Sequence, residues 1–321
     1  MNAAVFWSAW LSAAWWCLAP ILGATVLLAI HRLTGGTWGT AILPAAQALA
    51  RRLPRLLLLW LPLLFGLKAI YPFADGGGGW LHGIDRPGFL QAWFSPWFFV
   101  ARGFGYAFAA WRLARPAALA ASGPGRSATT LLLYLPLGSF AAVDAIGGLM
   151  PTWHSSVFAL TLLAGQLVAG TAACTWLTLR AGRPLPGRDL GNLLLMATML
   201  WAYLGFMQLL IIWAENLPKE ITWYLPRLRG PWWTGGAALL VLQFVLPLSL
   251  LLFRAVKDRP ARLAAVAALA WGAQWLDAAW QVLPSVVPTS AWAPPLSAAL
   301  AAAMGWAVFA GIGKELRHAE R

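Results

Sequence analysis

Few ionisable side chains lie within the apolar stretches of this sequence, and three are predicted to lie at a similar depth. Asp144 and Asp277 each come six residues before the end of an apolar stretch, and Arg102 comes eight residues into another. A charge inside a bilayer costs at least about 2.5–3.5 kcal/mol, so such residues mark a site by default. Because carboxyl groups bind and release protons, we expect Asp144 and Asp277 to carry protons beside Arg102.

Other polar residues lie near the same ends of these stretches. Lys68 is a second charge partner, while Glu215 and His154 are expected at the outer exit of a proton path. Gln208, on the helix of Glu215, is predicted to line that path. Gln274 and Gln281 share the helical face of Asp277 and are predicted to line the path as well.

The same residues also have a purely structural interpretation. The two aspartates could pair with Arg102 and Lys68 as ion pairs without any role in proton transfer. A stripe of small and polar residues at helical spacing is interpreted as a helix-packing face. This stripe consists of Gln166, Gly170, Cys174 and Thr178.

Composition identifies the class of protein. Hydrophobic residues make up 60% of the 321 residues and charged residues 10%, whereas soluble domains carry about 25% charge. The 22 tryptophans are typical of chains that cross membrane–water interfaces. The sequence therefore predicts an all-α polytopic membrane bundle that forms a single domain over residues 1–321, and it excludes soluble and disordered classes.

Cysteine and histidine content argues against resident redox cofactors. Two cysteines cannot hold an iron–sulfur cluster, which needs about four ligands. His31 and His154 are predicted at opposite membrane faces, so they cannot hold a haem between them. The net charge of +13 belongs mostly to short loops, so we assign it to membrane topology and expect no nucleic-acid partner.

Nine stretches are long enough to cross a bilayer core of about 30 Å as helices. The first is expected to be a retained span, residues 38–50 a surface helix, and the prolines at 54, 62, 136 and 247 sites where spans kink or break. The predicted spans are residues 4–30, 53–72, 94–114, 128–150, 155–179, 190–213, 232–254, 261–283 and 293–313.

Basic residues are distributed unequally between the alternating loops. With nine spans, 17 of the 23 lysines and arginines fall on one side. Because basic loops stay in the cytoplasm, we expect an external N-terminus and a cytoplasmic C-terminus. Counting 38–50 as a tenth span would destroy this asymmetry.

Five colinear motifs together resemble one family. Asp144-Ala-Ile-Gly-Gly-Leu-Met-Pro-Thr-Trp-His-Ser-Ser156 resembles its junction in which an aspartate closes one helix and Pro-x-Trp-x-Ser opens the next. Further motifs of the family, which occur in the same order along its chains, resemble residues 31–39, 98–102, 208–224 and 259–284. The family is the second quinone-binding membrane subunit of alternative complex III, a bacterial quinol:cytochrome c oxidoreductase, within the wider polysulfide-reductase-type group.

The resemblance implies a cofactor-free subunit of a respiratory complex in the bacterial inner membrane, with quinone or quinol as its ligand. Implied partners are a multihaem cytochrome c, an iron–sulfur protein, a paralogous quinol-binding membrane subunit and membrane lipid. A stand-alone transporter or channel is the alternative. A scaffold with a decayed site is another, since Gly148 and Met150 replace the family's usual serine and acidic residue.

Overall fold

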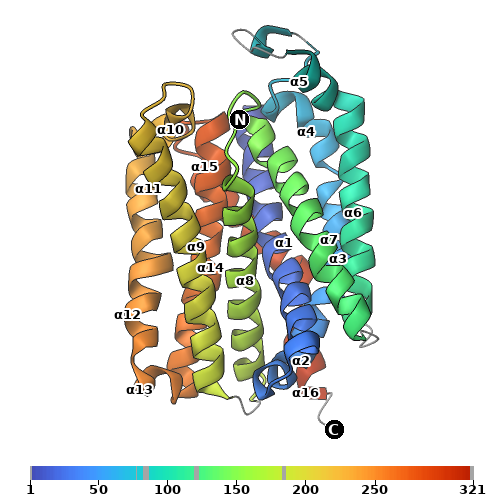
Figure 1. The fold of residues 1–321 in the computed structure, drawn as a ribbon, viewed down its shortest axis with the longest axis vertical. Coiled ribbons are helices and arrows are strands. Elements are labelled where there is room, and N and C mark those ends of the chain that lie inside the picture. Colours follow the sequence, from blue (N-terminus) through green and yellow to red (C-terminus); the bar gives the residue numbers. More distant parts are fainter. Residues whose placement is uncertain (1, 77, 82–86, 119–122, 183–185, 319–321) are drawn as a thin grey trace.

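A computed structural model describes the chain except residues 1, 77, 82–86, 119–122, 183–185 and 319–321. Its long helices run side by side along one axis, and the N- and C-termini lie at opposite ends of this bundle (Figure 1). The upper end in Figure 1 carries the short helices α5 (Pro87–Trp93) and α10 (Leu225–Leu228). The lower end carries α2 (Thr37–Ala50), α13 (Arg254–Lys257) and α16 (Ile312–His318).

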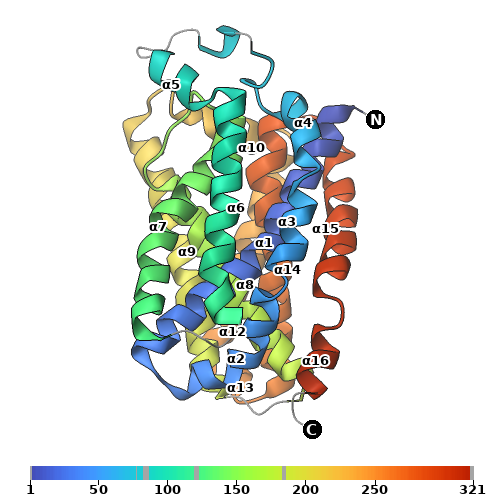
Figure 2. The ribbon, with the colours of Figure 1, turned by 90° about the vertical axis from the view of Figure 1, so that its right-hand side faces the viewer.

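Two helices form the centre of the bundle. These are α1 (Ala3–Thr34) and α8 (Phe158–Arg180), and their most apolar windows are 78% and 89% buried. The other helices of the bundle pack around them (Figure 2). They are α3 (Leu53–Trp60), α4 (Leu63–Ile70), α6 (Pro96–Ala118), α7 (Pro124–Ala145), α9 (Gly187–Glu215), α11 (Trp232–Leu239), α12 (Leu246–Leu252), α14 (Pro260–Val286) and α15 (Ala293–Phe309).

The outer helices expose large apolar side chains. Phe65, Trp213, Trp292 and Trp306, which are spread over the sequence, are each at least 74% exposed. Water would disfavour such a surface, whereas lipid chains accept it. Among the described residues, six helices are long and apolar enough to cross a membrane, or seven if a bent pair counts as one span. The protein is therefore a multi-pass, all-α membrane protein.

Each of the nine predicted spans contains helix, but α6 and α14 fall outside this set of six or seven. They have 23 and 27 residues, which is about 35 and 40 Å of helix at about 1.5 Å per residue. Both helices are long enough to cross a membrane, so it is their low mean hydropathy that keeps them out of the set of candidate spans. The polar residues that lower their hydropathy include Arg102 on α6 and Asp277 on α14.

The prolines within the predicted spans differ in their effect on the helices. The predicted span 53–72 is broken at Leu61–Pro62, where the helical axis bends by 59° between the segments Thr37–Trp60 and Leu63–Ile70. In contrast, α7 continues through Pro136. The predicted helix at 38–50 forms as α2, at the lower end of the bundle (Figure 2), and buries Ile42, Ala46 and Leu49.

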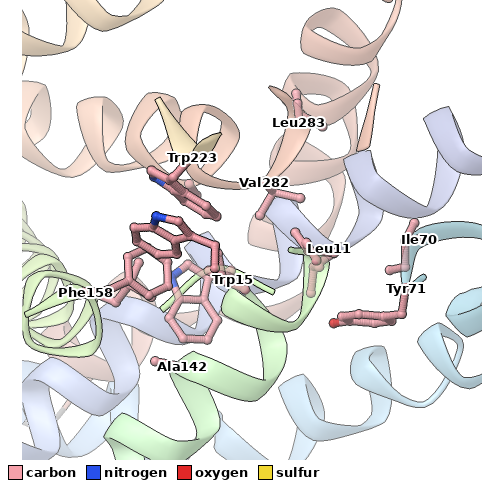
Figure 3. Packing of buried hydrophobic residues seen from close by; sticks show 14 of the residues in the cluster. Leu11, Trp15, Ile70, Tyr71, Ala142, Phe158, Trp223, Val282 and Leu283 are labelled. Atoms are coloured by element: carbon pink, nitrogen blue, oxygen red, sulfur yellow. The ribbon is translucent and has the colours of Figure 1, made fainter. Parts of the chain in front are cut away.

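Buried aromatic side chains fill the upper part of the core. Trp223, from the short 3-10 helix Ile221–Trp223, stacks on Trp153 at 4.6 Å between ring centroids, and Phe158 meets both rings edge-on. Val282 and Leu283 of α14 belong to the same cluster (Figure 3). This packing attaches the loop after α9 to the helices beneath it.

Candidate functional site

The structure brings two of the predicted site residues together as a buried ion pair. The Nε atom of Arg102 lies 2.8 Å from Oδ2 of Asp144, and its Nη2 lies 3.1 Å from Oδ1. Both side chains are less than 10% exposed. Two parallel hydrogen bonds of this kind fix the relative orientation of arginine and carboxylate. The structure therefore contains the expected ion pair between Asp144 and Arg102.

Two further donors complete the surroundings of Asp144. The Tyr106 hydroxyl donates to Oδ2 at 2.9 Å and the Trp93 indole N–H donates to Oδ1 at 2.9 Å. Arg102 also donates to the Trp93 carbonyl at 2.6 Å, and its guanidinium lies 4.1 Å from the centroid of the Trp93 ring. A carboxylate has about four acceptor positions, so all those of Asp144 are occupied.

Local helix geometry explains this convergence. Arg102 and Tyr106 are four residues apart on α6 and therefore share one face. Asp144 lies in the last turn of α7, which ends at Ala145, rather than within a continuous helix to residue 150 as predicted. Trp93 is the final residue of α5, at the upper end of the bundle. We call Trp93, Arg102, Tyr106 and Asp144 the α6–α7 cluster.

An apolar cavity adjoins the α6–α7 cluster. Its volume is about 220 Å³, and residues of α1, α3, α4, α6 and α7 line it. The lining is mainly leucine, alanine and aromatic side chains, with Asp144 and Tyr106 among its few polar members. A cavity of about 150 Å³ is enough to hold benzene, so this one has room for a substituted six-membered ring. Its chemistry suits a largely apolar ligand with a small polar group.

Asp277 lies in a different polar group. Its Oδ1 accepts from Gln281 Nε2 at 3.3 Å and its Oδ2 accepts from Trp201 Nε1 at 3.2 Å. Gln274 lies one turn below on α14, and all three α14 side chains are buried. We call Trp201, Gln274, Asp277 and Gln281 the α14 cluster. No hydrogen bond between described residues joins it to Asp144, so the two predicted proton carriers do not form one site.

The remaining predicted residues are dispersed. Lys68 is exposed on α4, and no ion pair involving it occurs within the described part of the chain. His154, in the loop before α8, and Glu215, the last residue of α9, are also exposed. Gln208 is buried on α9. Burial raises the pKa of the nearby loop residue Tyr224 to about 12.

Arg227 is a buried cation that the sequence pattern places in an outer loop. Its side chain is fully buried and donates to the carbonyls of Trp223, Trp280 and Gln281 and to the Ser285 hydroxyl, at 2.6–3.1 Å. Its guanidinium lies 3.5 Å from the centroid of the Trp223 ring. Burial lowers the pKa of Arg227, but arginine starts so far above neutrality that it stays charged.

Sequence patterns could have identified only some of these partners. Tyr106 follows Arg102 by one helical turn, which places it on the same face. Trp93 and Trp201 come from other elements, and no sequence periodicity connects them to the aspartates. Comparison of the whole chain with known protein families and with curated proteins gives no match to either. The candidate sites consequently stand on their own geometry.

Proposed function

We propose that this protein is a cofactor-free membrane subunit of a quinol:electron-acceptor oxidoreductase, of the type that its motifs resemble. The observation that carries the proposal is the α6–α7 cluster at the wall of the apolar cavity. A quinone combines an apolar ring and chain with two polar oxygen atoms. The cavity offers matching surfaces for both parts.

The proposal gives the predicted residues different roles. Because four donors already occupy Asp144, its role is to hold Tyr106 in place at the cavity wall, with Arg102 beside it. The Tyr106 hydroxyl oxygen retains an acceptor position towards a quinol hydroxyl. Asp277, with only two neutral donors, is the better candidate for proton transfer. Glu215 and His154 remain candidates for the outer exit.

The proposal also includes nine crossings, with the C-terminus in the cytoplasm of a bacterium. Two features support an odd number of crossings: the termini lie at opposite ends of the bundle (Figure 1), and α6 and α14 are long enough to span. The partners proposed are a multihaem cytochrome c, an iron–sulfur protein and a paralogous membrane subunit. They would supply the electron carriers.

Purification from native membranes tests the proposal. A chain tagged at its C-terminus should co-purify in mild detergent with haem c and iron–sulfur subunits, detected by mass spectrometry and a reduced-minus-oxidised spectrum. Tyr106→Phe should lower quinol-dependent acceptor reduction by this complex, whereas the exposed Tyr203→Phe should leave it unchanged. A solitary, colourless protein would contradict the proposal and favour a transporter.

A further inference from the structure

Asp277 is a buried carboxyl group with unusually little electrostatic support. Its two hydrogen bonds, at 3.2 and 3.3 Å, come from neutral donors and are long. Asp144, by comparison, accepts four bonds of 2.8–3.1 Å, two of them from a cation. An isolated buried carboxylate is very costly, and a carboxyl group avoids this cost by binding a proton. The donors around Asp144 therefore stabilise a carboxylate, whereas the surroundings of Asp277 favour a protonated carboxyl group.

Gly165 of α8 shows how Gln274 and Asp277 are arranged. A methyl group added at Gly165 would lie 3.0 Å from Gln274 Oε1 and 3.4 Å from Asp277 Oδ2. Two oxygen atoms therefore border the small gap that this glycine leaves. An ionised carboxylate and an amide oxygen are both acceptors and repel each other, whereas a protonated carboxyl group can donate to the amide oxygen.

Unpaired polar atoms occur in the α14 cluster and on a segment that packs against α14. Gln274 Nε2 and Gln281 Oε1 are buried and have no hydrogen-bond partner within the described structure. Both atoms of the fully buried Gln243 amide are also unpaired. Gln243 lies on a π-helical segment, Leu240–Val245, which packs against α14, and such segments are frequent at functional sites. Buried water commonly satisfies polar atoms of this kind.

No charged group on the neighbouring helices forms an ion pair or a hydrogen bond with Asp277 within the described chain, so none compensates for an ionised carboxylate there. Asp277 lies nine residues from the upper end of α14, about 14 Å deep. The buried Arg227 of α10 contacts α14 near Asp277, but it donates to the backbone carbonyls of Trp280 and Gln281 and not to the Asp277 carboxyl group. The other ionisable groups on elements packed against α14 are Cys17, His31, Arg32, Cys174, Arg180, Arg188, Asp189, Tyr203, Glu215, Arg254 and Lys257. None of them has a hydrogen bond to Asp277 within the described chain.

We propose that the α14 cluster is a hydrated proton-binding site in which Asp277 is a neutral acid that donates to Gln274 Oε1. On release, the O–H bond of the carboxyl group breaks, the proton passes to bound water, and the carboxylate keeps the electron pair. Gln281 connects the site to Arg227. Its side-chain amide N–H donates to Asp277, and its backbone carbonyl accepts from the Arg227 guanidinium. Quinol as the proton source rests on the proposed function; the site itself does not.

Infrared spectroscopy of the full-length protein in lipid tests this site directly. At neutral pH the wild type should show the C=O band of a protonated carboxylic acid, and the band should shift in D₂O. Asp277→Asn should remove the band and Asp144→Asn should retain it. Gln274→Leu should shift the band without removing it, because the acid keeps its proton and loses one acceptor.

Several results would overturn the proposal. These are no band in the wild type, a band that survives Asp277→Asn, or a band that Na⁺ abolishes, which would indicate a cation site. Binding of a short-chain quinone analogue, measured on the same samples, separates this test from the proposed function. Loss of quinone binding with an intact Asp277 band would contradict only the proposed function, and the reverse result would contradict only the proton site.

Discussion

At the scale of single residues, Asp144 and Asp277 show that similar sequence positions can have different chemistry. Each was predicted near the end of an apolar stretch. Asp144 accepts two hydrogen bonds from Arg102 and two more from Trp93 and Tyr106, whereas Asp277 accepts only from a glutamine amide and an indole N–H. Asp144 is thus held in an ion pair, whereas Asp277 has neutral donors alone, and this difference is why we propose Asp277 as the proton-binding group.

Substitutions in the α6–α7 cluster should be costly. Asp144→Asn leaves the buried Arg102 without its counter-charge and should lower the free energy of unfolding by about 3–5 kcal/mol. Tyr106→Phe removes one hydrogen bond to a charged group and should cost about 1.5–3 kcal/mol. Reversible unfolding in mixed detergent measures both. An Asp144→Asn variant as stable as the wild type would contradict the ion-pair role.

Sequence alone could predict the depth of the acidic residues but not their partners. Helical spacing places Gln274, Asp277 and Gln281 on one face, and the structure confirms that they are buried together. The pairing of Arg102 with Asp144 depends on how α6 packs against α7. Trp201 and the π-helical Gln243 depend on helix register, which a single sequence does not determine.

At the scale of elements, the closest helix contact is between α1 and α8. A methyl group on Gly23 would collide with the carbonyl oxygen of Gln166 and lie 2.9 Å from the Cα of Gly170. The predicted packing role of the stripe that contains Gln166 and Gly170 is therefore confirmed. Glycine lets the two backbones approach closely, which strengthens dispersion contacts where no water drives association.

Gly23→Ala should therefore separate these helices. We expect a loss of about 1–3 kcal/mol in the free energy of unfolding, because the two backbones cannot both keep their positions. Gly272→Ala in α14 is the matched control, since a methyl group there would meet no atom within 4 Å. It should be neutral or stabilise by up to about 1 kcal/mol. Equal effects of the two substitutions would refute the crossing argument.

Each predicted apolar stretch contains helix, but hydropathy leaves out two helices that carry buried charged residues. The two helices that hydropathy leaves out, α6 and α14, are those that carry Arg102 and Asp277. The break at Pro62 followed from proline chemistry. The continuity of α7 through Pro136 could not be predicted in this way, because neighbouring groups can compensate for the hydrogen bond that proline lacks.

At the scale of the whole molecule, the ends of the bundle differ in charge. The lower end holds an ion pair between Arg188 and Asp258, with atoms 2.6 Å apart, and another between Arg52 and Glu315. Basic residues of α13 and α16 lie there as well. This distribution favours the cytoplasm for the lower end, by the same rule that the loop charges follow.

Reporter fusions test this orientation. Green fluorescent protein fused after the C-terminus should fluoresce, because it folds in the cytoplasm. Alkaline phosphatase fused after Gly230, at the upper end, should be active because it needs export. Fusion of phosphatase after Asp258 is the control and should be inactive. Activity of the Asp258 fusion with a dark C-terminal fusion would invert the proposed topology.

The central position of α1 has a consequence for biogenesis. Ser12 of α1 shares a hydrogen bond with Ser297 of α15, 285 residues later, and Trp16 donates to the Trp271 carbonyl of α14. A ribosome therefore delivers α1 to the membrane long before the helices that enclose it. During that interval its serine hydroxyls and small residues face lipid or an insertion chaperone. Maturation of the bundle thus waits for the last third of the described chain.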